Sequence, residues 1–161
     1  MEMNSVYEFS FYIPSIPYLF PLLFIAVGIG FLISLRKPYV RKRLSRIFFG
    51  AVFIAVGIFT SFMCASQIIY NYTDIVIPYC NGEYSEVEGQ VENLETRPFW
   101  GNGDDSFTVN GVEFDIGSLQ PGYQKRAAYG GKITENGQTV KIKYIESDGF
   151  NYIMSLSIAE Q

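Results

Sequence analysis

A short basic segment separates two uncharged, mostly apolar runs, and this arrangement constrains the fold more than any other feature of the chain. Six of the eleven residues at 36–46 are Lys or Arg, whereas the runs at 17–35 and 47–70 carry no charge. Cytoplasmic loops of membrane proteins are enriched in Lys and Arg. The pattern therefore predicts a two-helix transmembrane hairpin over 17–70. The basic residues that set this topology are Arg36, Lys37, Arg41, Lys42, Arg43 and Arg46.

The lengths and flanks of the two runs agree with this topology. The first run has nineteen residues, about 29 Å of helix against a hydrocarbon layer of about 30 Å. The N-terminal tail at 1–16 has no base, and the first base after the second run is Arg97. We therefore expect a protein of the bacterial inner (cell) membrane, with the lipid bilayer as a partner and both termini outside.

Both predicted spans carry small residues at four-residue spacing. Small side chains allow helix backbones to approach closely in lipid. Two interpretations stay open: the stripes pack the hairpin on itself, or one of them mediates a homo-oligomer. The residues are Ala26, Gly30 and Ser34 in the first run and Gly57, Ser61 and Ala65 in the second.

The remainder of the chain is acidic. From Asp74 onward there are fourteen Asp and Glu against six Lys and Arg, a net charge of −8. Such a domain repels phosphate backbones, so we expect no nucleic-acid polymer as a partner. The chain has no histidine, which excludes His-based catalysis and His metal sites. Of the two cysteines, Cys64 and Cys80, we expect no intrachain disulfide, and an intermolecular bridge through Cys80 stays open.

A linker at 71–85 and a β domain at 86–161 follow the hairpin. Alternating apolar and polar residues predict five strands. The strongest local signal is Asn110-Gly111, which favours a two-residue type I′ turn between the second and third of them. That register sets Val109 opposite Val112, and Phe107 opposite Phe114. The predicted strands cover 86–94, 106–109, 112–116, 138–145 and 151–158.

A long segment at 117–137 links the third and fourth predicted strands. A structureless connection of that length is uncommon, so it predicts a short helix or a functional flap. Five strands with this connection match a small OB-like barrel, with an open sheet as the competing arrangement. Closure removes exposed strand edges, which favours the barrel. The fold class expected is therefore a membrane α-helical hairpin of two transmembrane helices plus a small all-β, five-stranded OB-like barrel.

Aromatic residues in the two long loops are the candidate contact site. They are either plugs of the core or an exposed patch for a partner. The turn around Asp104 and Asp105 has oxygen ligands suited to Ca²⁺ but lacks the EF-hand spacing, so we expect no metal. We also expect no cofactor and no catalytic residue, because no nucleophile–base constellation is evident. The candidate residues are Phe99, Trp100, Tyr123 and Tyr129.

Two runs in the β domain resemble an uncharacterised family of small bacterial proteins. The VEGQVEN run at 87–93 matches its VEGxVEN strand, and the SFTVNGVEF run at 106–114 matches its SFxVNGVxF hairpin. A Pro-Gly-Tyr turn at 121–123 and a Gly-Gly pair at 130–131 follow in the same order. Members often have a His before that pair, where this chain has Tyr129. The resemblance implies a shared β fold and no established activity.

In architecture alone, the chain is similar to two-span β-barrel effectors of cyclic-nucleotide anti-phage systems. The predicted orientation argues against that function, because the sensing barrel of such a protein must be cytosolic. We therefore expect a membrane-anchored, non-enzymatic β-barrel-like binding module that faces the periplasm or the cell exterior. Its ligand is an unknown protein or small molecule. The alternative is a ligand-responsive membrane effector or immunity component of a bacterial defence system.

Overall fold

The computed structural model describes residues 3–10, 15–36, 43–117 and 121–159 of the 161-residue chain. The chain divides into two compact units, which are described separately. The β domain comprises Met1–Phe11 and Asn71–Gln161, and the helical unit comprises Tyr12–Tyr70. The helical unit is therefore an insertion in the sequence of the β domain, between its first and second strands.

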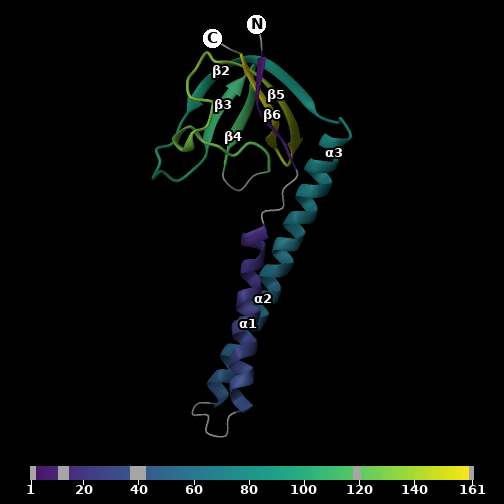
Figure 1. Ribbon diagram of the computed structural model, residues 1–161, viewed down its shortest axis with the longest axis vertical. Helices are drawn as coiled ribbons and strands as arrows, with labels where there is room; N and C mark the ends of the chain where they lie inside the picture. The colour runs from purple at the N-terminus through teal and green to yellow at the C-terminus, as the bar shows by residue number, and fades with distance from the viewer. Residues whose placement is uncertain (1–2, 11–14, 37–42, 118–120, 160–161) are drawn as a thin grey trace. The chain divides into compact units, whose positions relative to one another are not determined.

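Two antiparallel helices form the helical unit (Figure 1). Helix α1 covers Ser15–Ile33 and ends in a 3₁₀ turn, η1, at Ser34–Arg36, and α2 covers Arg43–Tyr70. The helices approach most closely at three buried glycines. A Cβ atom on Gly28 would lie 2.7 Å from the Gly50 carbonyl oxygen, and one on Gly57 would lie 3.1 Å from the Pro21 carbonyl oxygen. These glycines bring the two backbones into direct contact, which side chains would prevent.

The small residues predicted from the sequence are divided between the helix contact and the exposed surface. Ala26, Gly30 and Ala65 are exposed, and nothing lies within 4 Å of a Cβ atom placed on Gly30. Gly57 is buried against α1, and the half-buried Ser61 donates a hydrogen bond to the Gly57 carbonyl oxygen at 2.7 Å. The remaining residue, Ser34, accepts a hydrogen bond at 3.0 Å from a guanidinium nitrogen of Arg46.

The predicted two-span hairpin is wrong. In the described part of the chain, one helical run is long and apolar enough to cross a membrane: the 38 residues Arg43–Cys80, in which α2 continues into the π-helix η2 (Asn71–Val76) and α3 (Ile77–Cys80). Within α1, the apolar segment Leu19–Ile33 has fewer than 18 residues. This apolar segment is shorter than the roughly 20 residues of a typical spanning helix. The predicted run at 17–35 extends two residues past α1, which ends at Ile33 and is followed by η1.

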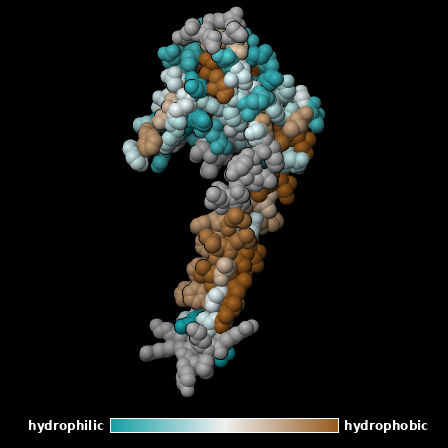
Figure 2. All heavy atoms as spheres, viewed as in Figure 1, coloured by the Kyte–Doolittle hydropathy of each residue, from teal (hydrophilic) through white to brown (hydrophobic). Residues whose placement is uncertain are grey.

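Apolar side chains dominate the surface of the helical unit (Figure 2). Phe59 and Phe62 on α2 are 64% and 68% exposed, and Leu19 and Leu23 on α1 are 56% and 59% exposed. A contiguous apolar surface of this extent marks a membrane or protein contact, because soluble surfaces rarely carry one.

The β domain is a six-stranded antiparallel sheet in the order β1-β6-β5-β2-β3-β4 (Figure 1). The predicted five-stranded closed barrel is therefore wrong. The sequence analysis missed β1, which pairs with the outer edge of β6 where closure would have needed β4. A side-chain contact bridges β4 and β6: the Asn151 amide donates to the Glu113 carbonyl oxygen at 2.8 Å. The strands are β1 Met3–Glu8, β2 Ser85–Glu95, β3 Asp105–Val109, β4 Val112–Ile116, β5 Thr139–Ser147 and β6 Phe150–Ala159.

The first strand is fixed at its end by Glu8. The Glu8 carboxylate accepts hydrogen bonds from the Tyr79 hydroxyl at 2.5 Å and the Ser155 hydroxyl at 2.9 Å. The bond from Tyr79 has the larger effect, and together the two bonds hold the pKa of the Glu8 carboxyl below its usual value. Both bonds favour the ionised carboxylate. Residues on either side of the helical insertion are thereby tied to β6.

The β3–β4 hairpin has the predicted register. Phe107 lies opposite Phe114 and Val109 opposite Val112. Asn110 and Gly111 have φ values of 48° and 81°, as a type I′ turn requires. The Phe107 and Phe114 rings stack with centroids 5.3 Å apart, and both are buried. The hairpin therefore supplies the two largest fully buried side chains of the core.

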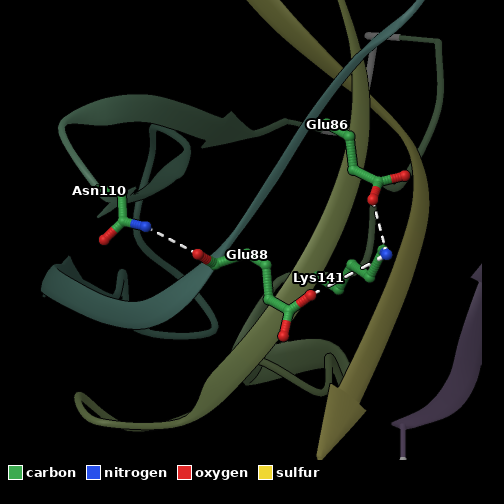
Figure 3. Close-up of polar contacts among 4 residues, drawn as sticks. All are labelled: Glu86, Glu88, Asn110 and Lys141. Atoms are coloured by element: carbon green, nitrogen blue, oxygen red, sulfur yellow. Dashed lines mark hydrogen bonds and ion pairs between the residues drawn. The ribbon is translucent and has the colours of Figure 1, made fainter.

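The hairpin turn also packs on β2 (Figure 3). The Asn110 side-chain amide donates to the Glu88 carbonyl oxygen at 2.7 Å. A Cβ atom on Gly89 would lie 2.8 Å from the Asn110 amide nitrogen, so this strand position is left without a side chain. On the neighbouring strand the Lys141 ammonium pairs with the carboxylates of Glu86 at 2.6 Å and Glu88 at 3.9 Å.

Replacement of Gly57 by Leu is expected to separate the helices, because its side chain meets the backbone of α1, whereas Gly30→Leu faces open space. The measurement is the distance between spin labels at the exposed positions Val27 and Val52 in lipid. Gly57→Leu should increase the label-to-label distance, because the helix axes move apart toward an ordinary interaxial separation of about 8–10 Å. Gly30→Leu should leave the distance unchanged. Equal distances in the two variants would contradict the packing described.

Gly89→Ala is expected to destabilise the β domain by about 1 kcal/mol, because the new methyl group displaces Asn110 and breaks its bond to Glu88. Asn110→Gly loses the same bond but keeps the turn, since glycine tolerates the positive φ. In a double-mutant cycle by denaturant unfolding, Gly89→Ala should cost little in the Asn110→Gly background. Additive effects would show that the two positions do not interact.

Candidate functional site

Two loops meet to form an aromatic cluster on the surface of the β domain. The β2–β3 loop contributes Phe99 and Trp100, and the 3₁₀ turn η3 at Ala127–Tyr129 contributes Tyr129. The Phe99 ring lies 4.8 Å from Trp100 and 4.9 Å from Tyr129, measured between centroids. We call these three residues the aromatic platform. Trp100 is 91% exposed, and the other two are about half exposed.

A shallow hollow of about 350 Å³ lies beside the platform rings. This volume is at the lower end of the range of ligand sites, about 300–1,000 Å³. The lining residues beyond the platform are Gly101, Asn102, Gly103, Asp104 and Arg126.

Arg126 joins the two loops. Its guanidinium is buried and donates to the Gly103 carbonyl oxygen at 2.6 Å. It also lies 4.7 Å from the centroid of the Tyr129 ring, in a cation–π arrangement. The Tyr129 hydroxyl donates in turn to the Phe99 carbonyl oxygen at 2.9 Å. The guanidinium is thus satisfied within the protein and holds the platform rings in place.

A single buried carboxylate, that of Asp105, holds both loops through backbone hydrogen bonds. Asp105, at the start of β3, is 1% exposed. One of its oxygens accepts the backbone N–H of Arg97 and the other accepts that of Ala127, both at 2.8 Å. Because hydrogen bonds to a charged group are stronger than neutral ones, this buried carboxylate anchors both loops to the sheet. Its oxygens are occupied by the backbone, which argues against the calcium turn considered from the sequence.

The fourth predicted aromatic lies elsewhere. Tyr123 is 5% exposed and belongs to the core, with its ring 5.4 Å from that of Tyr7. Its hydroxyl accepts the backbone N–H of Lys132 at 2.7 Å. Of the four predicted residues, the structure therefore brings three together and uses the fourth as a core plug.

One acid, Asp104, lines the hollow beside the platform, and its charge also acts on Asp115 in β4. Burial raises the pKa of the Asp115 carboxyl, and the neighbouring charges of Glu113 and Asp104 raise it further. Among the described residues, no group of three or more His, Cys, Asp or Glu side chains is placed to hold a metal ion. The site can therefore provide aromatic stacking and apolar contact beside one carboxylate, that of Asp104.

Only three of the six basic residues predicted to set the topology lie in the described part of the chain. Lys37, Arg41 and Lys42 lie outside the described residues, and Arg36 ends η1. Arg43 and Arg46 occupy the first turn of α2.

Sequence reasoning missed Arg126 and Asp105. The only local signal for Arg126 was its spacing of three residues from Tyr129. Asp105 looked like one of two turn residues, and nothing local distinguished it from Asp104. A search of family models, curated proteins and solved structures finds no match to the chain.

Asp105→Ala is expected to destabilise the β domain by about 3 kcal/mol, because the buried, charge-assisted bonds that this carboxylate accepts from the N–H groups of Arg97 and Ala127 are both lost. The matched control is Asp104→Ala, the exposed neighbour, which should change stability by less than about 0.5 kcal/mol. Denaturant unfolding of the full chain in detergent measures both. Equal effects would show that the two loops do not depend on Asp105.

Proposed function

We propose that this protein is a membrane-anchored, non-enzymatic binding module that presents the aromatic platform on the non-cytoplasmic side of a bacterial cell membrane. The partner is a protein or small molecule that covers Trp100.

The surface of the helical unit supports the anchoring. The helical run that contains α2 is long and apolar enough to cross a bilayer, and its exposed phenylalanines would be costly to leave in water. Arg43 and Arg46 lie at its start, and the described residues of α2 beyond Arg46 carry no charge. Cytoplasmic flanks are enriched in Lys and Arg, which supports a cytoplasmic position for this basic end of the helical run.

The exposure of Trp100 is the observation that carries the binding role. Trp and Tyr dominate the energetics of protein contacts, and they do so from sites whose geometry is set in advance. Here a 91% exposed indole sits on a platform held by Arg126 and Asp105. A platform braced in this way loses little conformational freedom when a partner binds.

The test places a photo-crosslinking amino acid at Asn102, beside the platform, in cells that produce the full chain. A partner that stacks on Trp100 should give one discrete adduct, and Trp100→Ala should remove most of it. The control site is Phe150, an aromatic residue 47% exposed at the β5–β6 turn. Adducts that persist in Trp100→Ala, or equal those from Phe150, would refute the binding role.

The natural cysteines report the orientation in the same cells. Cys80 is exposed, whereas Cys64 lies within α2. A membrane-impermeant maleimide should label Cys80 in intact spheroplasts, and Cys80→Ser should abolish that labelling. Labelling that requires lysis would place the β domain in the cytoplasm and overturn the orientation.

A further inference from the structure

Two lysines of the β domain stand apart from its other basic residues. Four of the six bases in this domain have partners: a carboxylate for Arg97 and Lys141, an aromatic ring for Lys143, and loop carbonyls with a ring for Arg126. Within the described part of the domain, the ammonium groups of Lys125 and Lys132 have no ion pair or ring contact. Both cations lie in a domain of net charge −10, where acids are in excess.

Both lysines line the same hollow, which is separate from the aromatic platform. Its volume is about 300 Å³, and no acid is among its lining residues. The lining therefore combines apolar and aromatic residues with two positive groups. The lining consists of Val6, Tyr7, Gly122, Tyr123, Gln124, Lys125, Gly130 and Lys132.

The walls of this lysine hollow are held in place by backbone contacts. The Tyr123 N–H donates to the Ile153 carbonyl oxygen at 2.9 Å, which fixes the loop to β6. The Tyr123 hydroxyl accepts the N–H of Lys132, and the Gly131 N–H donates to the Arg126 carbonyl oxygen at 2.9 Å. Gly122 has a φ of 96° and packs directly on Ile153, where a side chain would clash. The hollow is thus formed before any ligand arrives.

The chemistry of the lining restricts what it can hold. Two ammonium groups at one hollow give it a positive potential, which favours an anion there. Tyr7 and Tyr123 offer ring surface for an apolar body, and burial raises the pKa of both phenols, so they stay neutral beside an anion.

We propose that the lysine hollow is a binding site for a small soluble organic anion, in which a carboxylate or phosphate group meets Lys125 and Lys132 and an apolar or aromatic body packs on Tyr7 and Tyr123. The volume admits a ligand of about one ring with its anionic group, at the small end of known ligand sites. The site is distinct from the aromatic platform and does not depend on the platform's partner.

The experiment is calorimetric titration of the full chain, held in nanodiscs of neutral lipid, with phenyl phosphate. Phenol and inorganic phosphate are the matched probes, because each supplies one half of the proposed ligand. Phenyl phosphate should bind more tightly than either, and the double variant Lys125→Ala/Lys132→Ala should weaken it about tenfold, as expected for the loss of two exposed charge contacts.

The control variant is Lys141→Ala, which removes a lysine already paired with Glu86 outside the hollow. It should leave phenyl phosphate affinity unchanged. A second variant, Val6→Glu, brings a negative charge to the lining and should abolish binding while β-sheet circular dichroism is retained. The proposal is overturned if phenyl phosphate gives no binding at millimolar concentration, if the double lysine variant binds as the wild type does, or if inorganic phosphate binds equally well.

Discussion

The pairing of the first strand with the last is the constraint on which the architecture depends. β1 lies beside β6, with Met3 opposite Ala159, although the whole helical unit separates β1 from the rest of its sheet in the sequence. This ladder occupies the edge of β6 that a barrel would need for closure, so the sheet stays open. The carboxylate of Glu8 strengthens the arrangement, because it joins β1 to Tyr79, which follows α2, and to Ser155 in β6.

One loop serves both candidate sites. The segment at 121–132 gives Arg126 and Tyr129 to the aromatic platform, and Lys125 and Lys132 to the lysine hollow. Asp105 and Ile153 fix this loop to two different strands of the sheet. Binding residues on loops that a rigid scaffold positions are a common arrangement in proteins. A shift of this loop at one site would therefore be felt at the other, because the same backbone forms both.

Local patterns predicted local structure well, and failed where distant residues decide. The Asn110-Gly111 turn determines the hairpin register from neighbouring residues alone, and that register was confirmed. The strand at Met3–Glu8 could not be found, because its partner is about 150 residues away and its sequence does not alternate. Spacing by four did not reveal which glycine faces the other helix: Gly28 does and Gly30 does not. Of the candidate aromatics, only tertiary contacts separate Tyr129 on the surface from Tyr123 in the core.

The exposure of Trp100 has an optical consequence. It is the only tryptophan among 161 residues, so all indole fluorescence of the protein arises from one point on the platform. With 91% of its surface in water, that indole emits from a solvated environment in the free protein. Any molecule that covers the platform therefore shifts the emission wavelength of Trp100, and no other tryptophan adds a constant background to this signal. The protein therefore carries an intrinsic reporter at the position where its partner is proposed to bind.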